Sequence, residues 1–176
     1  MRYTFLTIIC IGSIFIGCQK DVPIDLPNEI IVNTSNLQFN GSASGCRSFC
    51  VFKTDSSDLY GLEVIANSDS LNLQLGIEQI IYLPHSFVEV SLNRHDSTAS
   101  SWYCNDVLIN GAQINESWEA LSGAVYITLI QDSIEVNPWA VTCKVNIRTE
   151  NILLADSFGV LPTVVFDSVL VGWLPG

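Results

Sequence analysis

The chain carries little positive charge. Its 176 residues include 7 Lys and Arg against 18 Asp and Glu, which gives a formal net charge of -11. Proteins that bind nucleic acid through its phosphates present clustered basic side chains, and a chain with so few and so scattered ones lacks that footprint. The composition therefore predicts no nucleic-acid partner.

Histidine is equally scarce, which limits the catalytic groups. The sequence has two histidines, His85 and His95, and no Gly-x-Ser-x-Gly elbow. His95, Asp96 and Ser97 follow one another, but neighbouring side chains of an extended chain point to opposite sides and cannot assemble a triad. Glu116 and Glu119 are expected on a short helical turn over 116–121, as a solvated edge. We predict no catalytic residues and no enzyme activity.

Patterns that bind metals or cofactors are also missing. The acids Asp55, Asp58 and Asp69 lack the spacing, central glycine and terminal glutamate of an EF-hand. Cys46 and Cys50 have a spacing that zinc sites use, but no second close pair completes the site. We predict no metal and no cofactor.

The chain has no apolar run long enough to cross a membrane as a helix. The run over 5–16 has about twelve residues and would span roughly 18 Å, against about 30 Å for a hydrocarbon core. With Arg2 before it, this run is typical of a signal peptide. It ends in Phe15-Ile16-Gly17-Cys18.

That ending resembles the lipobox of bacterial lipoproteins. The resemblance implies removal of residues 1–17 and acylation of Cys18, which would fix the protein to a membrane because several acyl chains bind almost permanently. Lys20-Asp21 is weakly similar to the surface-export signal of Bacteroidota lipoproteins. The expected location is the cell envelope, at the outer membrane on its periplasmic or surface face. With this lipobox the chain resembles the small lipoproteins of Bacteroidota.

Residues 18–35 are predicted to form a lipidated tether, and residues 36–176 one β domain. Pro23 and Pro27 favour extended chain in the tether. Period-2 alternation follows, most clearly over 139–147, and turn clusters such as Asn67-Ser68-Asp69 separate the runs. The pattern predicts an all-β fold, an antiparallel β-sandwich or a partly open barrel of about nine to eleven short strands.

Four cysteines lie in the predicted domain. Export favours disulfide bonds, and four cysteines allow three connectivities. Cys46 and Cys50 are close in sequence, so we favour each of them pairing with a distant cysteine. The candidates are Cys46, Cys50, Cys104 and Cys143.

Two sequence features suggest carbohydrate chemistry. Exposed indole rings stack on sugars, although each Trp is more often part of a core. The candidates are Trp118, Trp102 and Trp173. Asp-Ser occurs six times, and four copies resemble the acceptor site of Bacteroidota O-glycosylation, although Asp and Ser also favour turns. That resemblance implies glycans on Ser70, Ser97, Ser133 and Ser168.

Three classes of function fit the sequence. The first is a lipid-anchored envelope protein with a structural or protein-interaction role. The second is a surface module that binds a glycan or another small ligand. The third is a hydrolase, which requires His85, His95 or two facing carboxylates to meet in a cleft. Expected partners are therefore the membrane, through the lipid anchor, and a protein or glycan.

Overall fold

The computed structural model describes residues 31–46, 49–103, 113–137 and 140–172. For residue 68 and the described residues between 133 and 141 it describes the backbone alone. Cys18, Cys104 and Trp173 lie outside these ranges, together with the predicted signal peptide and most of the tether. Among the described helices, none has the length and apolar composition that crossing a membrane requires.

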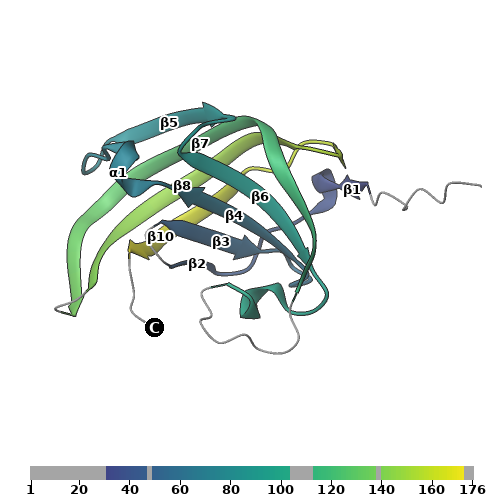
Figure 1. Ribbon diagram of the computed structural model, residues 1–176, viewed down its shortest axis with the longest axis horizontal. Coiled ribbons are helices and arrows are strands. Elements are labelled where there is room, and N and C mark those ends of the chain that lie inside the picture. The colour runs from purple at the N-terminus through teal and green to yellow at the C-terminus, as the bar shows by residue number, and fades with distance from the viewer. Residues whose placement is uncertain (1–30, 47–48, 104–112, 138–139, 173–176) are drawn as a thin grey trace, which may run out of the picture. The chain divides into compact units, whose positions relative to one another are not determined.

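The described chain is nearly all β, as predicted (Figure 1). Two 3-10 turns, η1 (Thr34–Asn36) and η2 (Ala99–Ser101), and the four-residue helix α1 (Ser68–Leu71) interrupt the strands. The strands are β1 (Val32–Asn33), β2 (Ala43–Cys46), β3 (Cys50–Thr54), β4 (Tyr60–Ala66), β5 (Glu78–Leu83), β6 (Val88–His95), β7 (Ile114–Asn137), β8 (Ala140–Leu154), β9 (Ser157–Phe158) and β10 (Val164–Gly172).

The ten described strands fall within the predicted number, and eight of them form a nearly closed barrel rather than a sandwich. One antiparallel sheet runs in the order β10-β8-β7-β6-β4-β3-β2, and β5 pairs with β7 outside this path. A small parallel sheet joins β1 to β9. Short connections place most sequence neighbours side by side, as expected for antiparallel strands.

Strand β7 shapes the barrel because, on one edge, it pairs with two different strands along its length. Its first part pairs with β6 up to Glu119, and its second part pairs with β5 from Gly123 onward. Gly123 has a φ of 131°, and a Cβ there would meet Ile152. Only glycine adopts this bend without strain. The helical turn expected over 116–121 is wrong, because this segment belongs to the extended β7.

The first and last strands of the sheet meet without a backbone ladder. Gly45 on β2 packs on β10 so closely that a Cβ would collide with the Leu170 carbonyl oxygen. Lys53 Nζ on β3 donates a hydrogen bond to the Val165 carbonyl oxygen on β10, at 2.9 Å. Side-chain packing and this one bond therefore close the barrel where strand pairing ends.

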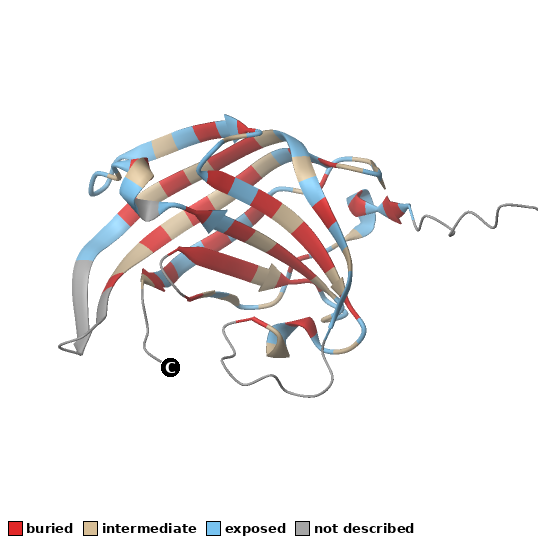
Figure 2. Cartoon of the chain, viewed as in Figure 1, coloured by how far each residue is buried: buried red, intermediate tan, exposed pale blue. Residues whose placement is uncertain are grey.

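Alternation along the strands separates the two faces of the barrel wall (Figure 2). Inward-facing residues form one hydrophobic core, for example Val64, Val90, Val125, Ile147 and Phe166. Residues between them in sequence face outward, as period-2 geometry requires. Apolar side chains of the described strands therefore pack in the interior of the barrel.

Candidate functional site

The outer face of β4, β6 and β7 carries a row of polar side chains. Glu63, Ser91 and Glu119 are direct cross-strand partners on three adjacent strands. The outer two Cα atoms are therefore separated by two strand spacings, roughly 10 Å. The row lines a hollow of about 420 Å³ that also includes His85 and Asn93. We name this hollow the lateral groove.

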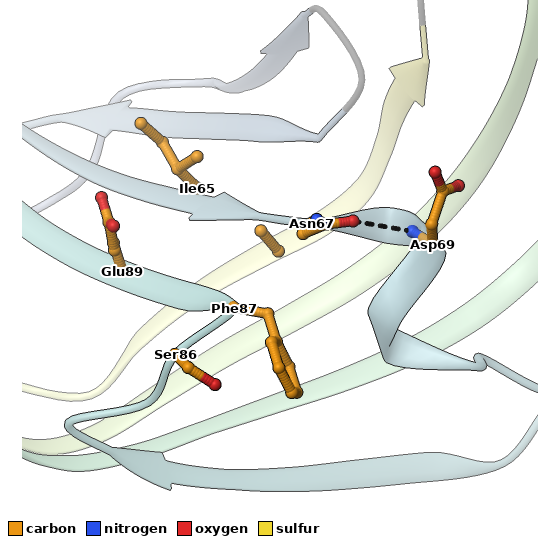
Figure 3. Close-up of a pocket in the computed structure, with 7 residues that line it drawn as sticks. Ile65, Asn67, Asp69, Ser86, Phe87 and Glu89 are labelled. Carbon is orange, nitrogen blue, oxygen red and sulfur yellow. Dashed lines mark hydrogen bonds between the residues drawn. The ribbon is translucent and has the colours of Figure 1, made fainter.

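A second hollow of about 360 Å³ adjoins the lateral groove at Glu89, which lines both. Figure 3 shows Ile65 on β4, Glu89 on β6 and Phe87 at the start of β6 around this second hollow. Asn67 and Asp69 close its far end, where the Asn67 side chain accepts a hydrogen bond from the Asp69 backbone N–H at 3.1 Å. Together the two hollows place four carboxylates, from Glu63, Asp69, Glu89 and Glu119, along one side of the barrel.

Glu63 is fixed in position at the inner end of the groove. Its Oε1 accepts a hydrogen bond from Cys50 Sγ at 3.1 Å, and its Oε2 accepts one from Asn93 Nδ2 at 3.2 Å. Asn93 in turn accepts from Ser117 Oγ at 2.7 Å and donates to the Tyr103 hydroxyl at 3.3 Å. This network holds Glu63 rigidly, because each buried polar atom has a partner.

Glu89 and Glu119 differ from Glu63 because they are exposed. No described Lys, Arg or His lies in an ion pair with either of them. His85, at the turn between β5 and β6, accepts a hydrogen bond on Nδ1 from the Phe87 backbone N–H at 3.4 Å. Among the described residues, no Lys or Arg lines the lateral groove. The groove therefore presents carboxylates to solvent without a balancing cation.

A cover segment, residues 98–103, lies on the outer face beside the groove. Asp58 anchors it: the Asp58 carboxylate accepts from the Ser100 backbone N–H at 2.9 Å and from the Ser100 hydroxyl at 2.7 Å. Tyr103 lies on Phe52 and its hydroxyl donates to the Gly61 carbonyl oxygen at 3.3 Å. Burial raises the pKa of Tyr103, so its hydroxyl is neutral and acts as a donor.

The cover segment encloses His95, away from the lateral groove. His95 is 2% exposed, and neither ring nitrogen has a hydrogen-bond partner. Its ring lies 6.0 Å from the ring of Trp102 and 5.5 Å from that of Tyr103, between centroids. Burial lowers the pKa of His95, and the nearby carboxylates of Asp96 and Asp58 offset part of that effect. His95 is thus a buried neutral ring rather than a member of a cleft.

The prediction that Trp118 is exposed for ligand stacking is wrong. Trp118 is 6% exposed and faces the core, because it occupies an inward position of β7 opposite Leu92. The polar neighbours that suggested exposure, Ser117 and Glu119, are the outward residues of the same strand. Trp102 is half-buried beside His95. Trp173 lies outside the described residues.

Glu116 and Glu119 do not share a face, contrary to the expectation for a helical turn. In the extended β7 they point to opposite sides. Glu116 lies on the inner side, where its Oε1 accepts from Arg94 at 3.1 Å. The facing pair on the outer side is instead Glu63 and Glu119. The period-2 pattern around Trp118 was the signal for this arrangement, but the sequence cannot tell which distant strand supplies Glu63.

The candidate cysteines lie in different places. Cys46 and Cys50 are direct cross-strand partners on β2 and β3. Cys143 is on β8 opposite Val171, and its thiol is free. The disulfide predicted for Cys143 is therefore not formed in the structure. Burial raises the pKa of Cys143, which keeps the thiol protonated. Cys104 lies outside the described residues.

Three of the four candidate glycosylation serines have described side chains. Ser168 is exposed, with φ 55°, at the irregularity between Phe166 and Val169 on β10. Ser70 in α1 and Ser97 after β6 are half-buried. For Ser133, on β7, the backbone alone is described. Ser168 thus interrupts its strand, which gives it the exposure that a regular inward strand position would lack.

Within the described residues, no group of three or more His, Cys, Asp or Glu side chains is arranged to hold a metal ion. No protein-family model, no curated protein and no solved structure matches the chain.

Proposed function

We propose that this protein is an exported lipoprotein of the cell envelope that binds a partner protein through the lateral groove. In this proposal acyl chains on Cys18 hold it at the outer membrane, and residues 19–30 connect the anchor to the barrel. The observation that carries the binding role is an open groove lined by Glu63, Glu89 and Glu119, in which no described Lys or Arg takes part. No catalytic role is assigned, because both oxygens of Glu63 are already committed and His95 is enclosed.

Charge complementarity indicates the chemistry of the partner. Glu63, Glu89, Glu119 and Asp69 line the two adjoining hollows, and Phe87 and Ile65 add apolar surface. An extended segment rich in Lys, with an occasional apolar side chain, complements this surface, since opposite charges steer and orient association.

A lysine-rich probe peptide tests this proposal. Its affinity for the acylated protein in lipid nanodiscs would be measured by fluorescence anisotropy. The double variant Glu89→Gln/Glu119→Gln should weaken binding roughly five- to tenfold, on the scale of two exposed charge pairs. The control Asp156→Asn/Asp167→Asn makes the same change of net charge outside the groove and should leave the affinity nearly unchanged. Equal losses in the two double variants would show attraction by net charge alone and would refute the groove.

A second candidate, glycan binding, has support from a different surface. Tyr82 on β5 is 71% exposed, on the outer face of the sheet. Its diagonal neighbour Tyr126 lies under the Arg148 guanidinium, 4.0 Å from the ring centroid. Arg148 also bonds Glu150 at 2.7 Å. An exposed ring beside charged hydrogen-bonding groups suits a sugar.

A glycan array of the acylated protein in detergent tests this second candidate. Tyr82→Ala should abolish binding of any glycan that uses the sheet face. Phe158→Ala, which removes another exposed ring elsewhere, serves as the control. Glycan binding that survives Tyr82→Ala would exclude this face.

A further inference from the structure

Exposed apolar side chains gather at one end of the barrel, around the β8–β10 connection. Phe158 belongs to the small parallel sheet, in which Asn33 pairs with Phe158 and Val32 with Ser157, and Ile31 directly precedes β1 of that sheet. Leu153 lies on the last outward position of β8, opposite Ser122 of β7. We define the apolar rim as the exposed residues Ile31, Leu121, Leu153, Phe158 and Val160.

Hydrogen bonds hold the rim as one structured surface. The Phe158 carbonyl oxygen accepts from Thr34 Oγ1 at 3.2 Å, which joins β9 to η1. The Leu161 backbone N–H donates to the Ile152 carbonyl oxygen at 2.9 Å, and Ser157 Oγ donates to the Leu154 carbonyl oxygen at 3.0 Å. These bonds fix the segment 157–161, which carries Phe158 and Val160. Phe158 and Ile31 are each 67% exposed, so neither side chain is buried in the core.

Ile31 of the apolar rim lies close in sequence to Cys18, and this closeness indicates that a membrane is the surface the rim meets. Ile31 is the first described residue, and 12 residues, 19–30, separate it from Cys18. Fully extended, such a segment spans at most about 45 Å, and as a flexible coil it averages roughly 20 Å. An acylated Cys18 would thus keep this end of the barrel within reach of the bilayer.

We propose that the apolar rim docks on the lipid surface to which the protein is anchored. Apolar side chains enter the boundary between head groups and acyl chains. The anchor supplies a high effective concentration, so the rim needs little affinity of its own. This inference rests on the proposed lipid anchor. It adds an orientation: the β1/β9 end faces the membrane, and the lateral groove opens to the side.

The electrostatics fit apolar docking rather than charge attraction. Cleavage before Cys18 would remove one basic residue, Arg2, and leave 6 basic against 18 acidic side chains. Asp156, in the turn directly before β9, is also acidic. Anionic lipids therefore repel the domain, and the contact should be strongest on zwitterionic lipids and insensitive to salt.

Site-specific photocrosslinking tests the proposal. A benzophenone residue would replace Phe158 in the acylated protein, reconstituted into phosphatidylethanolamine–phosphatidylcholine vesicles. The matched control replaces Leu75, which is 62% exposed and lies beside Leu129, eight residues from Leu121 along β7. Mass spectrometry would then count lipid adducts. We expect at least tenfold more adducts from position 158 than from position 75.

Three results separate the possible failures. Equal lipid adducts at the two positions, in protein with an acylated Cys18, would overturn the docking and leave the anchor intact. Protein–protein adducts at position 158 in place of lipid adducts would assign the rim to a second copy and also overturn it. An unmodified Cys18 in the intact mass would overturn the proposed anchor, and the docking with it. Adducts at position 158 that disappear in Ile31→Ser/Val160→Ser would support the rim as a unit.

Discussion

The ring of Tyr103 stacks on that of Phe52, with centroids 4.2 Å apart and an angle of 15° between the planes. Gly61, on the neighbouring strand, makes room for this stack, since a Cβ there would overlap the Tyr103 ring. Phe52 faces outward on β3 and is nevertheless buried. The cover segment therefore creates a second, smaller apolar layer outside the barrel.

Removing the Tyr103 ring should destabilise the protein more than removing its hydroxyl alone. We expect Tyr103→Ala to lower the free energy of unfolding by about 3–5 kcal/mol, as for other buried aromatic truncations. Tyr103→Phe keeps the stack and loses the bonds to Asn93 and Gly61, at a cost of about 1 kcal/mol. Urea denaturation measures both. Equal losses would mean that the stack on Phe52 contributes nothing.

The protein should lose stability below neutral pH because of His95. The pKa of His95 is lowered in the folded protein, so the unfolded chain takes up the proton first. Above about pH 6.5, the usual value, both states are neutral and the effect is absent. As the pH falls below 6.5, the free energy of unfolding should decrease by up to about 1.4 kcal/mol per pH unit for this one group.

His95→Phe provides the comparison for that pH dependence. It keeps a ring between Trp102 and Tyr103 and removes the titration. The difference between the unfolding free energies of the native protein and this variant should change between pH 6.5 and pH 5 and be constant from pH 7 to pH 8. A constant difference over the whole range would contradict a buried neutral His95.

We expect Cys46 to form a disulfide bond with Cys104. The Cys50 thiol donates to Glu63, the Cys143 thiol is free, and Tyr103, which precedes Cys104, lies over β3 beside β2. On a chain-entropy model, closing this loop contributes about 4 kcal/mol. Peptide mapping under non-reducing conditions would detect the linked pair, while Cys143 reacts with an alkylating reagent after denaturation. A linked Cys46–Cys50 peptide would refute the assignment.

If the protein is exported as proposed and is O-glycosylated, Ser168 should be the most fully modified site. Among Ser70, Ser97 and Ser168 it is the exposed one. Intact-mass and glycopeptide analysis of the protein from its native envelope would show hexose-containing mass on the peptide that contains Ser168, and Ser168→Ala should remove it. A mass equal to polypeptide plus acyl chains would contradict modification at every site.

Local alternation predicted the strands well where one face is buried. Val145 and Ile147 are buried, as the pattern over 139–147 indicates. Around Trp118 the polar outward residues of β7 obscure this alternation, and the sequence alone favours a helical turn there. A long strand that changes its pairing partner at Gly123 shows no distinct signature in a single sequence.

The lateral groove was not predictable from sequence for a different reason. Glu63, Ser91 and Glu119 come together only through the register of three strands that are far apart in the chain. Each residue alone is an ordinary outward polar position. The choice between sandwich and barrel was likewise set by contacts between the first and last strands, such as Gly45 with Leu170, which no local pattern records.

The junction of β2 and β10 determines the order in which the barrel comes apart. In the described residues, no strand pairing joins these two edges. They can separate without breaking a ladder, so the amides of β2 should exchange with deuterated solvent through local opening. Central β7 amides, bonded to strands on both sides, should exchange only on global unfolding. We therefore expect the barrel to open first at the junction of β2 and β10, while the other strands keep the core buried until global unfolding.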